Sequence, residues 1–229
     1  YHRYGDFFPG TGSIFDNGDG EGKNHAMNVP MKRGIDDDSY SYVFNTITKS
    51  VIDYYRPTAI ILQCGADSLC YDKLGDFNLT VKGHGSCVEF VKSFNLPILL
   101  LGGGGYTVEN VARCWTYETS ICLNEEIPDD LPITDFYSKY GQGLNHENYK
   151  LHFKAQNVPN LNDKSFLDEI IHYSLDSLKN IESAPNVDYN LPEEMYSEFN
   201  NEVKSGKVHS KEHQSEYYDT EEINLSAKR

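Results

Sequence analysis

The chain has 229 residues, which at about 150 residues per domain suggests one or two domains and a core that needs no disulfides. Its 35 acidic and 20 basic side chains give a formal net charge of −15, so its surface repels nucleic-acid phosphates and attracts basic partners. Hydrophobic residues make up 38% of the sequence, and no apolar run approaches the roughly 18 residues of a membrane span. These values disfavour general nucleic-acid binding, disorder of the whole chain and a transmembrane segment.

The five cysteines form no Cys-x-x-Cys pair, and an odd number cannot all be joined in disulfides within one chain. We therefore expect reduced and mostly packed thiols, as in an intracellular protein. The first residue is tyrosine rather than methionine, and no signal-peptide pattern follows it, so we expect a longer parent polypeptide. The cysteines are Cys64, Cys70, Cys87, Cys114 and Cys122.

Residues 1–24 are rich in glycine, aspartate and aromatic residues and are predicted to form loops. Residues 16–23 resemble a calcium-binding loop in composition. Gly18 and Gly20, however, fall where an EF-hand requires ligand side chains, so calcium binding is disfavoured. The apolar stretch at residues 26–31 is a candidate strand.

A long helix is predicted after the aspartates at 36–38, which with Ser39 are suitable N-terminal caps. Arg56-Pro57 ends it, because proline cannot continue a helix. Residues 58–62 follow as a continuously apolar strand, a pattern typical of a strand covered on both faces. The apolar face of the helix, with its three- and four-residue spacing, consists of Tyr40, Val43, Phe44, Ile47, Val51 and Tyr54 or Tyr55.

A second helix, a second apolar strand at residues 98–101 and a third helix follow in that order. The alternation of helix and strand predicts an α/β fold with a doubly wound, parallel sheet. In such sheets the functional residues lie at the carboxyl ends of the strands, here residues 63–68 and 102–107. The apolar positions that mark the two helices are Val88, Phe90 and Val91, then Val108, Val111, Ala112, Trp115 and Ile121.

Four glycines, residues 102–105, follow the second strand. A dinucleotide fingerprint would require glycine where Thr107 stands, and a Walker loop is absent, so nucleotide binding is disfavoured. The glycines could serve only a tight turn with close backbone approach. They could also bring Tyr106 to the floor of a pocket, where its phenol, protonated at neutral pH, would donate a hydrogen bond to a developing oxyanion.

Asp67 follows the first of the two strands, where a carboxylate is costly unless a metal or a charge compensates it. Capping of a turn or helix is an equally good explanation. A metal site needs further ligands, and the eight histidines are too scattered to supply them by spacing alone, with His84 predicted to pack on its own helix. The aromatic pair Phe7-Phe8 before Pro9-Gly10 is a core element or the wall of a pocket for an alkyl chain.

Several segments, in this order, resemble the C-terminal half of the catalytic domain of class I histone deacetylases. The resemblance runs from Tyr1 to about residue 185, and we expect residues 186–229 to be a disordered acidic tail. The segments that carry it are His2 to Gly12 (HRYGDFFPGTG), Leu62 to Leu69 (LQCGADSL), Phe77 to Thr80, Lys82 to His84, Val88 to Pro97, Leu101 to Tyr106 and Asn110 to Thr119.

The resemblance implies an arginase-like, three-layer αβα fold with a mainly parallel sheet, of which this chain holds only the C-terminal half. It also implies zinc-dependent hydrolysis of N-acetyl-lysine on histone tails. Asp67 would then be a zinc ligand and Tyr106 the hydrogen-bond donor to the carbonyl oxygen. The residues that match the substrate tunnel are Phe8, Leu74, Gly104 and Gly105.

The remaining family groups match no residue of this chain. The other two zinc ligands, the paired catalytic histidines and the second aromatic tunnel wall lie upstream of the residue that matches Tyr1. We therefore expect the isolated chain to be inactive and unstable. The alternative function is that of a catalytically inactive, truncated deacetylase-like protein that binds partners, and a nucleotide-dependent α/β enzyme ranks third.

The resemblance further implies acetylated histone tails and corepressor proteins as partners. The charge and the absence of a long apolar run predict no direct nucleic-acid or membrane binding. The cofactors that the resemblance implies are zinc and a structural monovalent cation such as potassium. The expected location is the nucleus, with the cytoplasm as a second one. Lys73 and Tyr140 match two positions of an inositol phosphate pocket, but Glu109 replaces an arginine there, so we expect weak or no binding.

Overall fold

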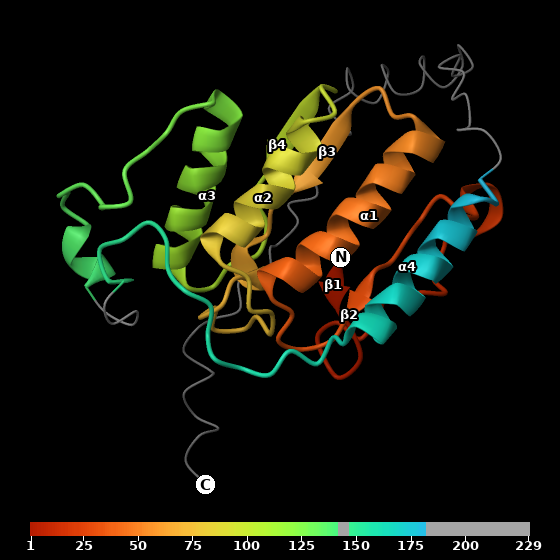
Figure 1. The fold of residues 1–229 in the computed structure, drawn as a ribbon, viewed down its shortest axis with the longest axis horizontal. Helices are drawn as coiled ribbons and strands as arrows, with labels where there is room; N and C mark the ends of the chain where they lie inside the picture. Colours follow the sequence, from red (N-terminus) through yellow and green to blue (C-terminus); the bar gives the residue numbers. More distant parts are fainter. Residues whose placement is uncertain (142–146, 182–229) are drawn as a thin grey trace, which may run out of the picture. The chain divides into compact units, whose positions relative to one another are not determined.

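The computed structural model describes residues 1–141 and 147–181, in which four α-helices accompany two short parallel sheets (Figure 1). The predicted tail, and with it the domain boundary at residue 185, lies outside these residues. No described helix is both long enough and apolar enough to cross a bilayer. The elements are β1 (His2–Arg3), β2 (Pro30–Met31), α1 (Asp37–Tyr55), β3 (Ile60–Gln63), α2 (Val81–Lys92), β4 (Ile98–Leu101), α3 (Val108–Leu123) and α4 (Lys164–Leu178).

Helix α1 confirms the predicted long helix and both of its ends. The Asp36 side chain accepts a hydrogen bond from the backbone N–H of Ser39 at 3.0 Å, which satisfies one of the free donors of the first turn. At the other end Arg56 adopts the left-handed conformation, with φ of 51°, and Pro57 prevents continuation.

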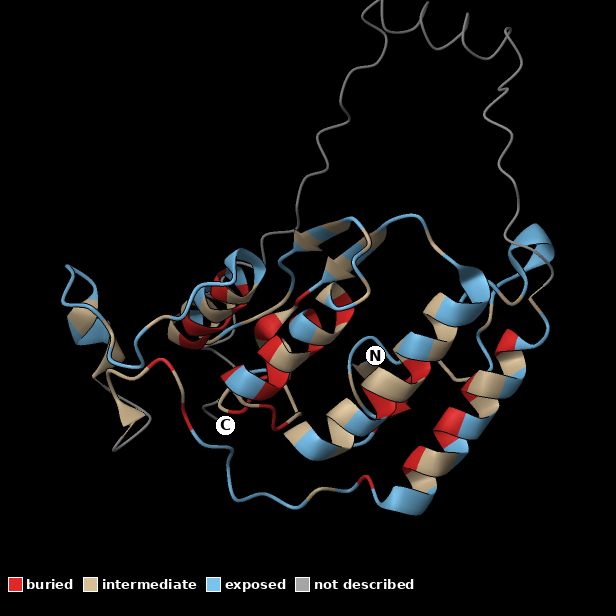
Figure 2. Ribbon diagram, turned by 45° about the horizontal axis from the view of Figure 1, so that its top comes forward, coloured by how far each residue is buried: buried red, intermediate tan, exposed pale blue. Residues whose placement is uncertain are grey.

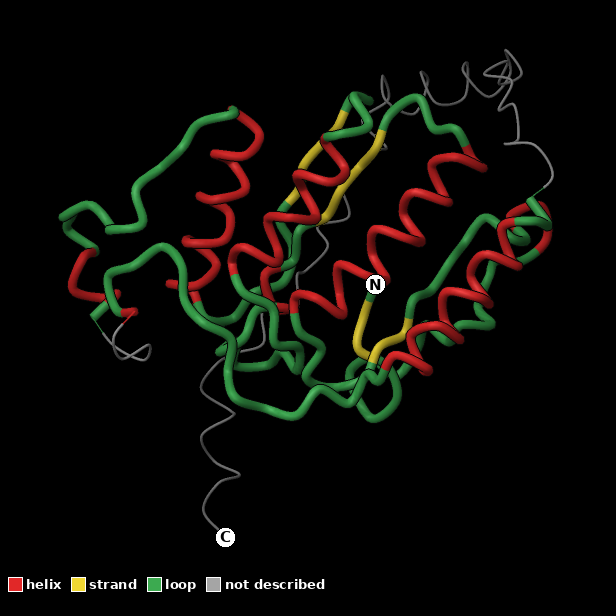
Figure 3. The backbone as a smooth tube through the Cα atoms, viewed as in Figure 1, coloured by secondary structure: helices red, strands yellow, loops and turns green. Residues whose placement is uncertain are grey.

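Strands β3 and β4 pair in parallel over their whole length, with Ile60 opposite Ile98 and Gln63 opposite Leu101, which confirms the predicted α/β arrangement. The helices run back along the sheet. Figure 3 shows β3 and β4 running down to the middle of the view, with α1, α2 and α3 beginning below the strand ends and running back up. The turns that follow the two strands therefore share one edge with three helix N-termini.

The prediction that both faces of these strands are covered is wrong for the described residues. Side chains of α1 and α2 cover one face, where Ile60, Leu62 and Ile98 pack against a buried cluster. The opposite face, which we call the open face, carries Ile61, Gln63, Leu99 and Leu101, and Ile61 is 70% exposed. In Figure 2 neither strand carries a red, buried residue. No described element lies over the open face to bury it.

Strand β1 and helix α4 were not predicted. Strand β1 lies in the stretch predicted as loop and pairs with β2, which confirms only the end of the candidate strand at residues 26–31. Helix α4 packs against α1 through Leu167, Ile170 and Ile171, whose spacing is helical. Asp163 caps α4 by accepting a hydrogen bond from the N–H of Phe166 at 2.8 Å.

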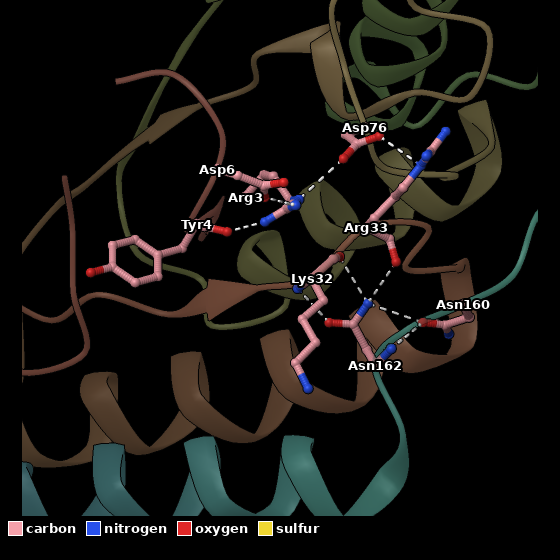
Figure 4. Close-up of polar contacts among 8 residues, drawn as sticks. All are labelled: Arg3, Tyr4, Asp6, Lys32, Arg33, Asp76, Asn160 and Asn162. Atoms are coloured by element: carbon pink, nitrogen blue, oxygen red, sulfur yellow. Dashed lines mark hydrogen bonds and ion pairs between the residues drawn. The ribbon is translucent and has the colours of Figure 1, made fainter. Parts of the chain in front are cut away.

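Polar contacts fix β1 and β2 to the loops around them (Figure 4). Arg3 donates a side-chain hydrogen bond to Asp76 at 3.1 Å, and Arg33 forms an ion pair with the same carboxylate at 3.0 Å. Asn162 pairs with the backbone of Lys32 in both directions, accepting at 2.7 Å and donating at 2.9 Å. The loop before α2 and the segment before α4 are therefore tied to the small sheet.

All five cysteines are free thiols, as predicted from their number and spacing. Four are buried, and Cys122 is exposed. Burial raises the pKa of Cys64, Cys70 and Cys87 to about 12, because a thiolate loses its hydration there. These buried thiols pack as small apolar groups.

Candidate functional site

The turns after β3 and β4 run side by side. The N–H of Cys64 donates to the carbonyl of Leu101 at 2.8 Å, and the N–H of Ala66 donates to that of Gly104 at 2.7 Å. A Cβ atom on residue 103 would lie 2.9 Å from the Cα of Gly65, and one on residue 104 would lie 2.1 Å from Asp67 Oδ2. Close backbone approach thus explains glycine at 103, and the Asp67 carboxylate fills the space that a side chain at 104 would need. The Asp67 carboxylate at the loop would repel a bound phosphate, which argues against the nucleotide alternative.

Asp67 lies half-buried in a 3₁₀ turn, Ala66–Ser68, directly after β3. Burial raises the pKa of its carboxyl group, and the nearby Asp72 charge raises it further. The turn's N-cap is Gly65, and no described residue donates a hydrogen bond to the Asp67 side chain except its own backbone. The capping explanation is therefore wrong, and the carboxylate is left with oxygen atoms available to a ligand.

Tyr106 follows the glycine run and is 47% exposed. Gly105, directly before it, has a φ of 140°, a conformation that favours glycine. A Cβ atom on residue 105 would lie 3.2 Å from Ala66 and 2.6 Å from Val111, so a side chain does not fit there. Helix α3 begins two residues after Tyr106. The tyrosine is thus presented at the sheet edge that also carries Asp67.

Asp72 joins the two loops, a role that sequence analysis missed. Its Oδ1 accepts from the N–H groups of Leu74 and Gly75, at 2.9 and 2.8 Å. Its Oδ2 accepts from those of Tyr106 and Thr107, at 2.7 and 3.2 Å. An aspartate two residues before Leu74-Gly75 is a recognisable turn signal, but nothing local indicates the bond to Tyr106.

His84 lies in α2 and bridges to two other elements, so the prediction that it packs on its own helix is wrong. One ring nitrogen contacts the Glu118 carboxylate of α3 and the other lies 3.0 Å from the carbonyl oxygen of Gly65. The Gly65 carbonyl can only accept, so the nitrogen facing it donates, and an ionised Glu118 carboxylate accepts from the other nitrogen, which makes the ring an imidazolium in that ion pair. Burial opposes this charge, but Glu118, Gly65 and Asp67 outweigh it and raise the pKa of His84.

Cys114 completes a buried group with these residues, its thiol donating to Glu118 at 3.8 Å. Ligand atoms of His84, Cys114 and Glu118 lie within 4.8 Å of one another, the one such group in the described part of the chain. Both nitrogens of His84 are already committed as donors. The group is therefore a buried ion pair with a thiol beside it, not a prepared metal site.

The other predicted site residues are mostly exposed, and few of them make contacts with the two loops. Leu74 is 61% exposed beside Asp72, and Lys73 is exposed next to it. Phe8 is 84% exposed, and no ring contact joins it to another described residue. The Arg113 guanidinium lies over the Tyr140 ring, 4.7 Å from the ring centre. Arg113 is one helical turn after Glu109 in α3. Asp72 and the glycine run link Asp67, Leu74, Gly104, Gly105 and Tyr106. Among the described residues, no hydrogen bond or ring contact joins Phe8 to this group or Lys73 to Tyr140.

A model of the histone deacetylase domain matches residues 1–122. Over 185 residues the chain is 51% identical to "Type-1 histone deacetylase 1" of Dictyostelium discoideum, covering 81% of this chain and 36% of the relative. It is 49% identical over 187 residues to "Histone deacetylase 1" of Homo sapiens (82% and 38% covered) and 50% identical to "Histone deacetylase clr6" of Schizosaccharomyces pombe (82% and 45%). The chain thus spans less than half the length of these relatives. With the family model matched over more than half of its residues, the chain belongs to the histone deacetylase family.

Proposed function

We propose that this chain forms the C-terminal part of the catalytic domain of a zinc-dependent deacetylase that hydrolyses N-acetyl-lysine on histone tails. The observation that carries the proposal is the pairing of Asp67 and Tyr106 on two adjoining loops at the carboxyl ends of parallel strands. This edge is where α/β sheets hold their ligands. The relatives named as histone deacetylases make acetyl-lysine the substrate to test.

The residues present fit zinc with one ligand. The Asp67 carboxylate is half-buried, takes no hydrogen bond from another described residue and has a pKa raised by burial and by Asp72. A divalent cation would relieve that unfavourable charge. Catalytic zinc sites use three protein ligands, so two more must come from outside the described residues.

The proposed reaction assigns separate tasks to the chain's own residues. Zinc, when bound, would act as a Lewis acid toward the amide carbonyl and activate water. Asp67 would hold the metal, and the Tyr106 hydroxyl would donate a hydrogen bond to the carbonyl oxygen as its charge develops. Leu74 and Phe8 would line the path of the acetyl-lysine chain, beside the backbone of the glycine run. The net charge of −15 would attract lysine-rich histone tails.

The family also supports a finer account of the fold. We infer an arginase-like, three-layer αβα domain in which an N-terminal part supplies the rest of the sheet and covers the open face. The apolar side chains Ile61 and Leu99, exposed at 70% and 55%, are the surface such a layer would bury. A structural potassium ion, corepressor partners, weak or no inositol phosphate binding and a nuclear location, with the cytoplasm second, remain parts of this proposal.

One observation favours the alternative of an inactive partner-binding protein. Among the described residues, no pair of histidines stands beside Asp67, and the one nearby imidazole, His84, is committed to Glu118 and Gly65. An acid/base function therefore has to be supplied by residues outside this part of the chain. If none supplies it, the open face would serve only to bind another protein.

The test compares the chain alone with the chain preceded by the N-terminal part of its Dictyostelium relative. Zinc content and turnover of an acetyl-lysine peptide are measured on both. We expect no turnover from the chain alone and one zinc ion with turnover from the joined protein. In the joined protein, Asp67→Ala should lose metal and activity, and Tyr106→Phe should lower kcat about 10²–10³-fold with zinc retained.

Tyr54→Phe, at an exposed position of α1, is the matched control and should change neither the zinc content nor the turnover of the joined protein. Turnover by the chain alone, with metal at unit stoichiometry, would refute the expectation that it is inactive. A folded, zinc-loaded joined protein that leaves acetyl-lysine intact would refute the proposed function. Turnover by Tyr106→Phe within a few-fold of the parent would remove Tyr106 from the mechanism.

A further inference from the structure

We propose that Asp72 is a positioning residue for the proposed deacetylation. It clamps the loop after β3 to the loop after β4 and thereby fixes the place of the Tyr106 hydroxyl. This inference rests on the proposed function, because it concerns the residue that would stabilise the oxyanion. It adds a residue that touches neither the metal nor the substrate.

The clamp uses both carboxylate oxygens, one for each loop. Oδ1 accepts two N–H groups from its own loop, and Oδ2 accepts the N–H groups of Tyr106 and Thr107, the former at 2.7 Å. Thr107 adds a second link, since its hydroxyl donates to the carbonyl of Tyr71 at 2.8 Å. The two loops are thus joined at Asp72 and at Tyr71, the residue before it.

Within the described part of the chain, only hydrogen bonds from these backbone N–H groups stabilise the negative charge of Asp72. No ion pair among the described residues includes Asp72. Hydrogen bonds from backbone N–H groups to a carboxylate are stronger than those to a neutral acceptor. The unpaired carboxylate therefore binds the two loops more firmly than an amide would.

Asp72 holds the Tyr106 backbone directly, whereas the other bonds to this stretch reach its neighbours Gly104 and Thr107. Glycines at 102–105 precede Tyr106, and glycine restricts the backbone less than any other residue. On the other side, Thr107 is the N-cap of α3 but makes no side-chain capping hydrogen bond. The Tyr106 ring is half-exposed, so packing does not fix it either. Asp72 is the described side chain that bonds to the Tyr106 backbone.

Asp72→Asn removes the link between the two loops while keeping the size of the side chain and one acceptor oxygen for a turn. Asparagine keeps one acceptor oxygen but turns an NH₂ group toward the N–H donors of the other loop. One pair of hydrogen bonds is therefore lost, and the loops are no longer joined through residue 72. The matched control is Asp76→Asn in the same loop, whose carboxylate pairs with Arg3 and Arg33 and not with Tyr106.

The experiment is a double-mutant cycle with Tyr106→Phe in the joined, zinc-loaded protein. We expect Asp72→Asn to lower kcat about 10–100-fold, as a misplaced catalytic group does, with KM and zinc content unchanged. In the Tyr106→Phe background the same change should lower kcat less than about 3-fold, because the group it positions is gone. Amide hydrogen exchange at residues 106 and 107 should be faster in Asp72→Asn and unchanged in Asp76→Asn.

Equal losses of kcat in both backgrounds would overturn the inference, as would unchanged exchange at residues 106 and 107. If Asp72→Asn does not fold, Asp72→Ser provides the second variant, because serine still accepts from its own turn but cannot reach both loops. A parent protein that is folded and zinc-loaded but inert toward acetyl-lysine refutes the proposed function instead. The exchange measurement still decides whether Asp72 holds Tyr106 in that case.

Discussion

His84 and Glu118 form the most buried ion pair of the described residues, and they support the turn that carries Asp67. The Glu118 side chain is 2% exposed, and that of His84 is 11% exposed. One nitrogen of His84 donates to Gly65, two residues before Asp67, and the other to Glu118. Removal of the carboxylate would leave a buried cation without its partner, which costs more than the pair itself contributes.

Glu118→Gln should therefore lower the free energy of unfolding by about 3–5 kcal/mol at pH 6. Because the pKa of His84 is raised in the folded chain, this contribution is complete below the unfolded value of about 6.5 and is lost as pH rises through the folded value. The difference between parent and variant should shrink as the pH rises above 6.5. Urea unfolding followed by the fluorescence of Trp115, the chain's single tryptophan, measures it.

Glu89→Gln, at an exposed position of α2, is the control for the loss of one negative charge. It should leave the unfolding free energy within a few tenths of a kcal/mol of the parent, roughly the usual effect of a surface change. A Glu118→Gln variant as stable as the parent at pH 6 would contradict the ion pair. A difference in unfolding free energy between the parent and Glu118→Gln that grows with pH would contradict it as well.

Helix caps differ in what they hold together. At the start of α2, Thr80 Oγ1 accepts from the N–H of Gly83 at 3.1 Å and donates to Asp37 Oδ2 at 2.6 Å. The N–H of Thr80 also donates to Asp37, at 2.8 Å, so α1 and α2 share this cap. A Cβ on Gly83 would lie 1.9 Å from Asp37 Oδ1, which leaves no room for a side chain. The cap of α4, Asp163, is exposed and bonds only within its own first turn.

Thr80→Ala should accordingly destabilise the chain more than Asp163→Ala. We expect about 1 kcal/mol for Asp163→Ala, which loses a cap alone. Thr80→Ala should cost about 2–3 kcal/mol, since it also removes a hydrogen bond to a charged group. Parallel urea titrations of the two variants provide the measurement. Equal losses, or a larger loss for Asp163→Ala, would mean that the contact with Asp37 adds nothing to the cap.

Elements whose signals are local were predictable. Helix α1 and strand β4 agree with the predicted ranges, because their caps, periodicity and flanking glycines lie within a few residues of them. Strand β1 has two residues and exists only through β2, nearly thirty positions away in the chain. The faces of β3 could not be assigned, since four successive residues that are mostly apolar show no alternation to indicate which side is covered.

The site residues, too, were predictable from the sequence only where their signals are local. Asp67 and Tyr106 could be singled out because each directly follows a strand, and the glycine run marks a close backbone approach. Asp72 and the bridge from His84 to Glu118 could not, because each joins residues 34 positions apart. Helix α4 is a different case. Its Asp163 cap and apolar spacing were present in the sequence and would have predicted it.

At the scale of the whole molecule, the open face sets the behaviour of the isolated chain. Ile61, Leu99 and Leu101 stand together on two paired strands, exposed at 70%, 55% and 43%. A contiguous apolar surface of this kind favours association. The net charge of −15 opposes it through repulsion between copies, and salt screens that repulsion. The balance between these two effects is open to measurement.

We expect the isolated chain to self-associate through the open face, more strongly as salt is added. Replacement of Ile61 and Leu99 by lysine should return it toward a monomer in light scattering, since a charge there is costly to bury. Leu123→Lys, which changes an exposed leucine at the end of α3, should not. The joined protein should be monomeric without any replacement, because its N-terminal part would cover the same face. Association that persists in the joined protein, or that Leu123→Lys abolishes, would place the contact elsewhere and remove the open face as the surface that the rest of the domain buries.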